Sequence, residues 1–405
     1  MTDIVRRRST FPVEVCARRG QPLGMPPARF LHDYWQKQPL LIRNAFPGFK
    51  PPLAPEDLAG LSCEDGALAR LVLRDRRTDR WRVEQGPFAE ARFATLPARD
   101  WTLLVQDVDK WDADVVALLD DFDFLPRWRI DDVMISYAVD GGGVGPHVDQ
   151  YDVFLLQGQG VRRWRISTDP AAPQALRGDV ELKMLAGFTA THDWQLYPGD
   201  MLYLPPGVPH DGVAEGDGLT FSIGMRAPAQ SELLLDLAEH LAEHLPETRR
   251  YGDPDLVPAR AAGEIDTASL ARVRQALGPL AATLPTLELA DWFGRFITRY
   301  RAAQTASPPP RPTTSAAFIA ALRANRPLLR HPWSRCAWSR RGRGATLYVA
   351  GQALPCSRAA AVIVCGPAPM PADAVRALPA TDRQRLCDLL NDGHLRFGSR
   401  PRGLQ

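Results

Sequence analysis

Hydrophobic and polar residues alternate over short stretches through the middle of the chain. From Asp131 onward the stretches DVMISYAV, HVDQYDVFLLQ, VRRWRIS, DWQLYPGDMLYLP and LTFSIGMRAP are separated by turns rich in glycine and proline. Short strands with such turns at close spacing are typical of a β-sandwich or barrel. We therefore predict an α+β protein whose central domain, residues 25–228, is a double-stranded β-helix, or jelly roll.

The period of the pattern changes at Ser231. SELLLDLAEHLAEHL has apolar residues at helical spacing, and helical patterns continue to about Tyr300, so residues 229–304 are predicted to be helical. Residues 305–316, TASPPPRPTTSA, have the composition of a linker. A helix, two strand candidates and further helices follow, in the order of a winged-helix module over 317–405. Residues 1–24, which are basic, are predicted to form a flexible arm.

Composition narrows the class of protein. The 405 residues are 45% hydrophobic and 24% charged, with a net charge of +2, as expected of a globular protein of two or three domains. The near-neutral balance gives no support for a DNA-binding protein. No apolar run has the length of a membrane span or a signal core, and the six cysteines form no CxxC pair. We predict a reduced cytoplasmic setting without membrane association.

Three residues in the β-rich region have the chemistry of a metal site. His147 and Asp149 are two apart in a strand and therefore project from one face. Distant strands of a jelly roll lie side by side, so His210, at the end of LYPGDMLYLPPGVPH, is the best third ligand. Two imidazoles and one carboxylate with open positions form the facial triad of non-haem Fe(II) oxygenases, whereas structural zinc prefers four ligands.

Arg162 stands in the strand-like run VRRWRIS. Alternation groups Arg162 with Trp164 and Ile166, and the opposite grouping, with Val161 pointing inward, is equally compatible with the pattern. A guanidinium among apolar neighbours requires an anion, and its planar fork suits a carboxylate. Beside an iron triad, a dicarboxylate such as 2-oxoglutarate would meet Arg162, and Ser136 either adds a hydrogen bond or is satisfied within the sheet.

These residues carry a resemblance to a known family. GGGVGPHVDQYDVFLLQGQGVRRWRIS together with LYPGDMLYLPPGVPH is similar to the JmjC-type, cupin-fold ribosomal oxygenases, specifically their bacterial branch. FLHDYWQKQPLLIRNAF and RIDDVMISYAV are similar as well. The resemblance covers Pro27 to about Pro228, and the helical and winged-helix sections match the family in order.

The resemblance implies an activity. Family members are protein hydroxylases that use Fe(II) and 2-oxoglutarate, and the bacterial branch hydroxylates an arginine at its β-carbon in the sixteenth protein of the large ribosomal subunit. By motif position, His147, Asp149 and His210 would bind iron, and Arg162 with Ser136 would bind 2-oxoglutarate. The resemblance also implies a homodimer formed through the helical section. Asp140, beside the glycine run, either binds a substrate guanidinium or forms a turn.

Other interpretations remain at this point. His240 and His244 in HLAEH match the HxxEH pattern of zinc peptidases, although the leucines mark an amphipathic helix with both histidines toward its polar side. His192 also begins an HxD and is an alternative ligand. A non-catalytic cupin with a winged-helix tail is a further alternative. Its basic run SRRGRG, residues 339–344, would bind RNA or the ribosome. The simpler interpretation of that run is a solvated turn.

Overall fold

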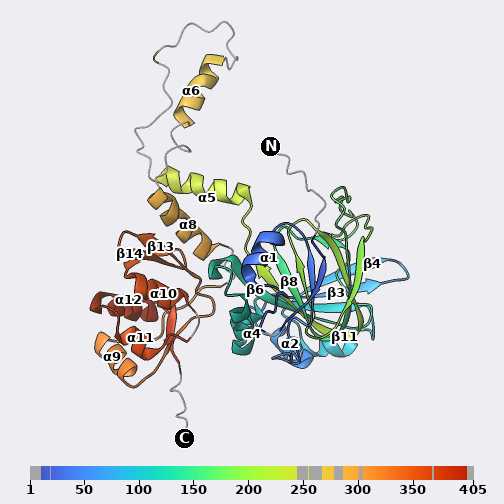
Figure 1. Ribbon diagram of the computed structural model, residues 1–405, viewed down its shortest axis with the longest axis horizontal. Helices are drawn as coiled ribbons and strands as arrows, with labels where there is room; N and C mark the ends of the chain where they lie inside the picture. The colour runs from blue at the N-terminus through green and yellow to red at the C-terminus, as the bar shows by residue number, and fades with distance from the viewer. Residues whose placement is uncertain are drawn as a thin grey trace. The chain divides into compact units, whose positions relative to one another are not determined.

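The computed structural model describes residues 11–18, 20–243, 254, 267–277, 286–300, 304–366 and 369–398. It divides into two compact units, Met1–Ala227 and Pro228–Gln405, which are described separately. The first unit contains the predicted jelly roll, and the second contains the helical section and the winged-helix module (Figure 1). The finer boundaries at residues 304 and 316 stay predictions.

Eleven strands of the first unit are joined in one sheet network. The hydrogen-bonded order is β1-β2-β10-β8-β11-β6-β5-β3-β4, with β7 on β11 and β9 on β8. The strands are β1 (Glu14–Cys16), β2 (Leu40–Arg43), β3 (Ala69–Asp75), β4 (Arg80–Gln85), β5 (Trp101–Val105), β6 (Ile130–Ala138), β7 (His147–Val148), β8 (Val153–Ile166), β9 (His192–Leu196), β10 (Met201–Leu204) and β11 (Pro209–Met225).

The long strands β8 and β11 bend the sheet into a jelly roll. They pair with each other on both sides of an irregularity, at which the register shifts between Glu215 and Thr220. On one side β8 also pairs with β10, and on the other side with β9. Gly160 lies at this bend with a φ of +70°, and a Cβ there would lie 2.1 Å from the carbonyl oxygen of Asp217, so only glycine fits.

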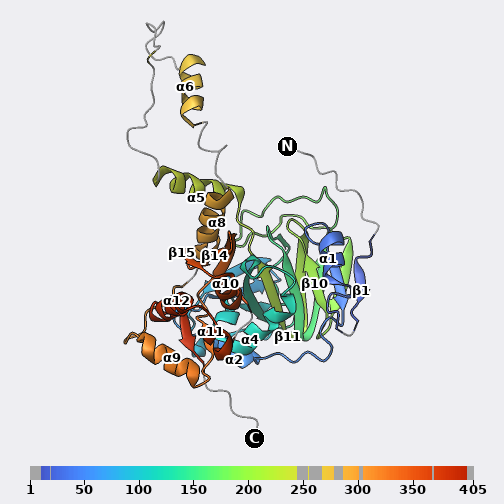
Figure 2. The same ribbon diagram turned by 60° about the vertical axis from the view of Figure 1, so that its left-hand side comes forward.

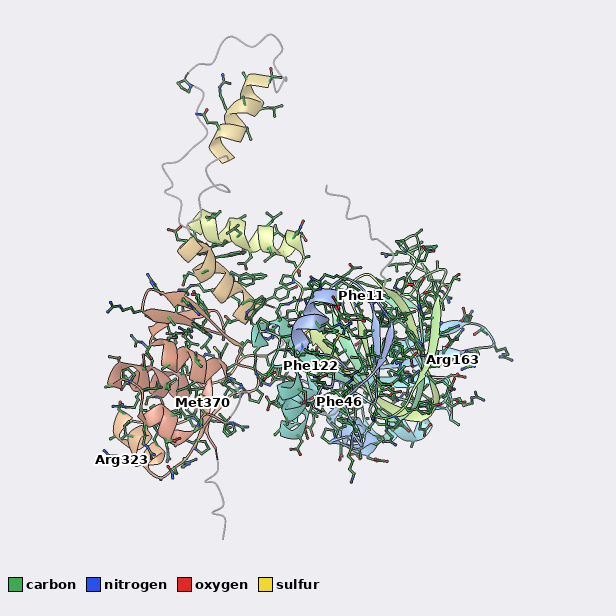
Figure 3. All side chains as sticks on the ribbon, viewed as in Figure 1. Phe11, Phe46, Phe122, Arg163, Arg323 and Met370 are labelled. Carbon is green, nitrogen blue, oxygen red and sulfur yellow. The ribbon has the colours of Figure 1, made fainter. Side chains whose placement is uncertain are left out.

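Short helices cover one face of the network and form the main core with it. Phe30, Leu58 and Phe122 pack from this layer onto strand residues such as Phe154, and the ring centroids of Phe122 and Phe154 are 5.0 Å apart. Phe122 is labelled in Figure 3. The helices are α1 (Pro27–Asp33), α2 (Pro55–Leu61), α3 (Val108–Trp111) and α4 (Ala113–Leu118), with 3-10 turns η1 (Glu90–Thr95), η2 (Leu119–Phe122) and η3 (Arg127–Arg129).

The N-terminal segment differs from the predicted flexible arm. Residues 14–16 form β1, which is labelled beside α1 in Figure 2. It pairs in parallel with β2 so that Val15 lies opposite Ile42. Leu23 is buried in the main core. Gly24 has a φ of +71°, and a Cβ there would lie 2.7 Å from the Val15 side chain. Residues 11–18 and 20–24 are therefore part of the fold, and residues 1–10 lie outside the described residues.

The second unit contains a small α+β core. Phe318, Leu322 and Met370 are buried in it (Figure 3). Its helices are α5 (Gln230–Glu243), α6 (Thr267–Leu277), α8 (Thr286–Arg299), α9 (Ser315–Arg323), α10 (Arg358–Cys365), α11 (Ala372–Arg376) and α12 (Ala380–Asn391). Its strands are β12 (Leu328–Arg330), β13 (Cys336–Arg341), β14 (Gly344–Val349), β15 (Gln352–Cys356) and β16 (Leu395–Phe397).

Helix α8 packs on the winged-helix strands, although the sequence places it before the linker. Gly294 of α8 leaves room for the ring of Tyr348, because a Cβ at Gly294 would lie 2.3 Å from that ring. The Thr298 hydroxyl accepts a hydrogen bond from the Gly351 amide at 2.9 Å. The basic run 339–344 spans the end of β13, a turn at Gly342 and the start of β14, which is the solvated turn weighed above.

Candidate metal centre and active site

The fold brings the three predicted ligands together. Strand β7 pairs antiparallel with β11 so that His147 lies directly opposite His210, and Asp149 follows β7. The distance from Asp149 Oδ1 to His147 Nε2 is 4.0 Å, and from Asp149 Oδ2 to His210 Nε2 it is 3.6 Å. Among the described residues, this is the one group of three or more His, Cys, Asp or Glu whose ligand atoms lie within 4.8 Å of one another.

Backbone carbonyls orient both imidazoles. His147 Nδ1 lies 2.9 Å from the carbonyl oxygen of Gly145, and His210 Nδ1 lies 2.9 Å from that of Val208. A neutral imidazole that donates from Nδ1 keeps a lone pair on Nε2, the atom that faces Asp149. Burial, with His147 close by, lowers the pKa of His210 to about 4. His210 is therefore neutral at physiological pH, as a metal ligand must be.

The two rival histidines within the described residues, His192 and His240, lie outside the His–Asp–His group. His192 lies on β9, where its ring contacts Trp194 at 5.1 Å and its Nδ1 is 2.9 Å from Thr191 Oγ1. Of the peptidase-like pair, His240 lies on α5 and His244 lies outside the described residues. The structure therefore does not test the HxxEH motif as a pair.

Arg162 points into the fold, as one of the two alternations predicted. Its residue is 5% exposed, whereas the Arg163 side chain is 52% exposed and pairs with Asp193. Arg163 is labelled at the margin of the first unit in Figure 3. The Arg162 guanidinium donates to Ser136 Oγ at 3.2 Å, to Thr220 Oγ1 at 3.4 Å and to the Gly212 carbonyl oxygen at 3.2 Å. Arg162 thus ends in a buried polar pocket beside the predicted Ser136.

This pocket leaves part of the arginine unsatisfied. No carboxylate among the described residues forms a salt bridge with Arg162, and its Nε has no hydrogen-bond partner. Burial lowers its pKa to about 10, so it remains charged at pH 7. A buried cation without a counter-charge is destabilising unless an anion reaches it. The pocket therefore has the chemistry of a carboxylate-binding site.

Sequence reasoning missed Thr220 and Gln157, and it assigned no role to Trp164 beyond its grouping with Arg162. Thr220 is 1% exposed and donates to Gln157 Oε1 at 2.9 Å. The Trp164 ring contacts both Arg162 and His210. The guanidinium carbon of Arg162 is 5.1 Å from a centroid of the Trp164 ring, and the ring centroids of Trp164 and His210 are 5.9 Å apart. Thr220 lies opposite Ser136 in the β6–β11 ladder. The sequence indicates Thr220 only as a polar residue within an apolar strand, which is also how Ser136 stands out.

Asp140 lies at the start of the glycine-rich turn before His147. Its Oδ2 pairs with Arg99 Nη2 at 2.6 Å, and its Oδ1 accepts the Gly216 amide at 3.1 Å. The side chain is 45% exposed. Asp140 therefore both supports the turn and presents a carboxylate that a second guanidinium could reach in competition with Arg99.

Family models match both units of the chain. A JmjC domain matches residues 117–233, and a ROXA-like winged helix matches residues 283–396. The ribosomal protein uL16 3-hydroxylase of Escherichia coli is 37% identical over 301 residues, which are 74% of this chain and 79% of that protein. The chain belongs to the JmjC ribosomal oxygenases.

Solved structures agree with this family. The X-ray structure of E. coli YcfD is 33% identical, has a TM-score of 0.81 and aligns over 92% of this chain and 98% of that one. YcfD was also solved in complex with cobalt and 2-oxoglutarate, at 32% identity, a TM-score of 0.78 and coverage of 93% and 99%. A probable ribosomal oxygenase of Haemophilus influenzae is 38% identical over 58% of this chain and 56% of its own.

Membership of the ribosomal oxygenases confirms the predicted jelly roll, winged helix and oxygenase class. The winged-helix match begins at residue 283, consistent with the packing of α8 on β13 and β14. The alternative of a non-catalytic binding module loses its support. Among the described residues, no helix combines the length and apolar character that a membrane span requires.

Proposed function

We propose that this JmjC ribosomal oxygenase hydroxylates an arginine of ribosomal protein uL16 at carbon 3, the β-carbon, using Fe(II) and 2-oxoglutarate. The observation that carries the proposal is an assembled His–Asp–His group together with a buried arginine, Arg162, that forms no salt bridge among the described residues and lies on β8, the strand paired with the strand of His210. The name of the E. coli relative, a uL16 3-hydroxylase, supports the protein substrate and the position of the new hydroxyl group.

The triad fits an iron ion. Two metal–ligand bonds of about 2.1 Å span at most about 4.2 Å. The Nε2–carboxylate distances of 3.6 and 4.0 Å fall within that span. Three ligands leave coordination positions open, as an Fe(II) oxygenase requires, and structural zinc would take a fourth protein ligand. We assign His147, Asp149 and His210 as the ligands.

The pocket around Arg162 fits the far carboxylate of 2-oxoglutarate. The guanidinium supplies the counter-charge, and its unpartnered Nε is the donor left for the ligand. The hydroxyls of Ser136 and Thr220 both accept from Nη1. The Ser136 hydroxyl can also donate to a carboxylate oxygen, whereas that of Thr220 already donates to Gln157. Arg162 is the primary anchor in this assignment, and Ser136 assists it.

The protein residues position the reactants and keep the site dry. When bound, Fe(II) and 2-oxoglutarate supply the oxidising chemistry that activates dioxygen. The Gly145 and Val208 carbonyls hold the imidazoles in their metal-binding tautomer. Trp164, at 5% exposure, excludes water between the arginine and His210.

Asp140 is the proposed contact for the substrate guanidinium. Its carboxylate is half-exposed beside the turn that leads to His147. An Asp140→Asn variant removes the charge and retains an oxygen for the Gly216 amide. We expect it to raise KM for the peptide and to leave KM for 2-oxoglutarate unchanged. An equal change in both would show that Asp140 acts only through the turn.

The experiment is a hydroxylation assay with a panel of peptides that together cover uL16. Enzyme, Fe(II), 2-oxoglutarate and air are combined, and succinate and peptide mass are measured. A one-oxygen gain on an arginine, lost when that arginine is replaced by lysine and lost in His147→Ala, supports the proposal. Succinate formation without any modified peptide would retain the oxygenase and reject uL16 as its substrate.

We also propose a homodimer formed through the helical section. No residue of α5 is buried, and Leu234 and Leu235 are 67% and 71% exposed. Leu270 and Val273 of α6 are exposed as well. Leucines at this exposure are typical of a helix that packs on another chain. A Leu234→Glu/Leu235→Glu variant should elute as a monomer in size-exclusion chromatography with light scattering, and an unchanged dimer would reject this interface.

The cellular setting follows from the substrate. Ribosomal proteins are made and assembled in the bacterial cytoplasm, where we place the enzyme. We further propose that the winged-helix unit reads no DNA sequence. Residues 317–405 contain fourteen arginines and four acidic residues, so any binding to DNA should be electrostatic, and a gel-shift assay should show equal affinity for unrelated duplexes.

A further inference from the structure

The near-neutral charge of the chain hides a local concentration of arginine. Residues 70–82, which span β3, its turn and the start of β4, contain six arginines and two aspartates, a net charge of +4. The hairpin and residues 97–100 line a groove of about 850 Å³. The arginines of this groove, called the arginine groove below, are Arg74, Arg76, Arg77, Arg80, Arg82 and Arg99.

Most of these guanidiniums are held in place and remain accessible. Arg74 pairs with Asp79, Arg76 with Asp100, and Arg99 with Asp140. Their side chains are 37%, 49% and 60% exposed. A carboxylate occupies one edge of a guanidinium and leaves other N–H groups free to donate. The ion pairs therefore fix the direction of the cations and do not remove their donors.

Within the described part of the chain, Arg77 and Arg80 have no ion-pair partner within 4 Å. A hydrogen bond from the Thr78 hydroxyl, the amide of Arg77 and, to a smaller extent, the Arg77 charge lower the pKa of the nearby Asp75 carboxyl. Both arginines are exposed. They lie at the turn of the hairpin, on either side of Asp79. Two arginines without a salt bridge lie beside arginines whose ion pairs leave donors exposed. Such a surface attracts a polyanion.

An aromatic side chain accompanies the cations. Trp81 lies opposite Arg74 in the β3–β4 ladder, and the Arg74 guanidinium carbon is 5.0 Å from the centroid of its ring. Arg80 and Arg82 flank it in the sequence. An arginine-lined groove with an aromatic ring is the combination that holds the backbone and stacks the bases of single-stranded nucleic acid.

We propose that the arginine groove binds the phosphate backbone of single-stranded RNA, with Trp81 and Arg74 as the stacking platform. A groove with six guanidiniums exceeds what one phosphate requires and suits a strand of several nucleotides. The choice of RNA over other polyanions rests on the proposed function, because a ribosomal protein substrate assembles with ribosomal RNA.

The groove borders the approach to the metal site. Arg76 donates to the Gly141 carbonyl oxygen at 3.5 Å, and Arg99 holds Asp140, so both contact the turn that precedes His147. RNA in the groove would therefore lie next to the loop that we assign to substrate binding. This places the hydroxylation of uL16 in reach of an RNA-bound substrate.

The test is fluorescence anisotropy with a fluorescein-labelled twelve-nucleotide uridine RNA and the full-length protein. For a single strand the slope of log affinity against log salt is about −0.7 per phosphate contact, so six contacts predict an affinity loss of about 300-fold between 50 and 200 mM KCl. In Arg77→Gln/Arg80→Gln, four contacts predict a loss of about 50-fold over the same range, and weaker binding at 50 mM.

The matched control removes the same charge elsewhere. Arg340→Gln/Arg341→Gln changes two exposed residues at the end of β13 in the second unit, and this variant should bind the RNA like the unchanged protein. Equal weakening in both variants would show that net charge alone sets the affinity, and weakening only in the control would place the RNA on the winged-helix unit. Either result would overturn the proposal.

Two further readouts separate the ligand class and the underlying function. Polyglutamate should compete with the RNA poorly, and competition at equal charge concentration would reject RNA in favour of an acidic protein. Hydroxylation of the free uL16 peptide should be unchanged in Arg77→Gln/Arg80→Gln. RNA binding that persists while no uL16 peptide is hydroxylated would reject the proposed substrate and leave the groove as an RNA site.

Discussion

Replacing Arg162 by methionine tests whether this arginine serves the ligand or the fold. Methionine retains the length and apolar character of the stem, and it removes the charge and the donors. Arg163→Met is the matched control. The Arg163 side chain is next in sequence, but it points outward, is half-exposed and pairs with Asp193. The two variants differ by one position and by the face of β8.

Two opposing effects set the stability of Arg162→Met without ligand. A pKa lowered from 12.5 to about 10 corresponds to roughly 3 kcal/mol against burying the charge. Methionine relieves that penalty and loses three hydrogen bonds, to Ser136, Thr220 and Gly212, each worth about 1 kcal/mol. The terms nearly cancel, so the unliganded variant should be within about 1 kcal/mol of the unchanged protein. A buried side chain that only supports packing would cost about 2–5 kcal/mol when truncated.

The ligand response should then separate the variants. With Co(II) present and 2-oxoglutarate at one hundred times its Kd, binding stabilises the fold by about 2.7 kcal/mol, which raises the Tm by roughly 5–10 °C. Thermal unfolding followed by tryptophan fluorescence measures this shift. We expect the shift to be absent in Arg162→Met and intact in Arg163→Met. A ligand shift that survives in Arg162→Met, or an unliganded Arg162→Met that loses more than about 3 kcal/mol, would refute the assignment of Arg162 as the carboxylate anchor.

Further predictions concern the ligands, the packing and the pH dependence. His147→Ala should weaken Co(II) binding more than about 100-fold in a visible-absorption titration, and His192→Ala should leave it unchanged. Gly212→Ala places a Cβ 2.6 Å from the Trp164 ring and should lower the free energy of unfolding in urea by about 1–3 kcal/mol. Gly178→Ala, with no atom within 4 Å of its Cβ, should have little effect. Burial, with Asp107, Asp131 and Asp109 nearby, raises the pKa of Asp132 to about 7. Its charge therefore destabilises the fold increasingly as the pH rises from about 4 through 7. Asp132→Asn should stabilise the protein at pH 8 by about 1–2 kcal/mol, less than the full shift implies because the side chain is partly exposed, and should have no effect at pH 4. An equal gain at both pH values would contradict the assignment of this charge.

The sequence predicted the local part of the site and not its tertiary part. The shared face of His147 and Asp149 follows from strand geometry, and so does the grouping of Arg162 with Trp164. Alternation alone leaves open whether that group points inward, and the metal triad nearby favours the inward choice. Thr220, Gln157 and the Gly212 carbonyl come from strands that only the β6–β11–β8 ladder places together. No periodicity within one strand records which distant strand lies beside it, so His210 was assigned from motif order and family resemblance.

The fold was predicted best where a pattern was long. Strand β1 has three residues, too few for alternation to distinguish it from coil, and its pairing with β2 is parallel and non-local. The packing of α8 on β13 and β14 was missed because the proline-rich stretch 305–316 follows it and marks a boundary in composition. A linker in sequence does not separate two elements whose apolar faces pack together.

If Arg162 anchors the cosubstrate as we propose, the uninterrupted pairing of β8 with β11 between His210 and Ala214 sets the distance between the two ends of the bound molecule. In this register His210 lies opposite Ile166, and Ala214 lies opposite Arg162. Strands rise about 3.4 Å per residue, and the ladder fixes how far the cation stands from the ligand histidine. Insertion of one residue in this interval would turn Arg162 to the outer face. Under this assignment, the hydrogen-bonded backbone sets which length of dicarboxylate can bind. Side-chain substitutions change that backbone distance little. Selectivity among dicarboxylates should therefore survive substitution at every position of the ladder except those that touch the ligand.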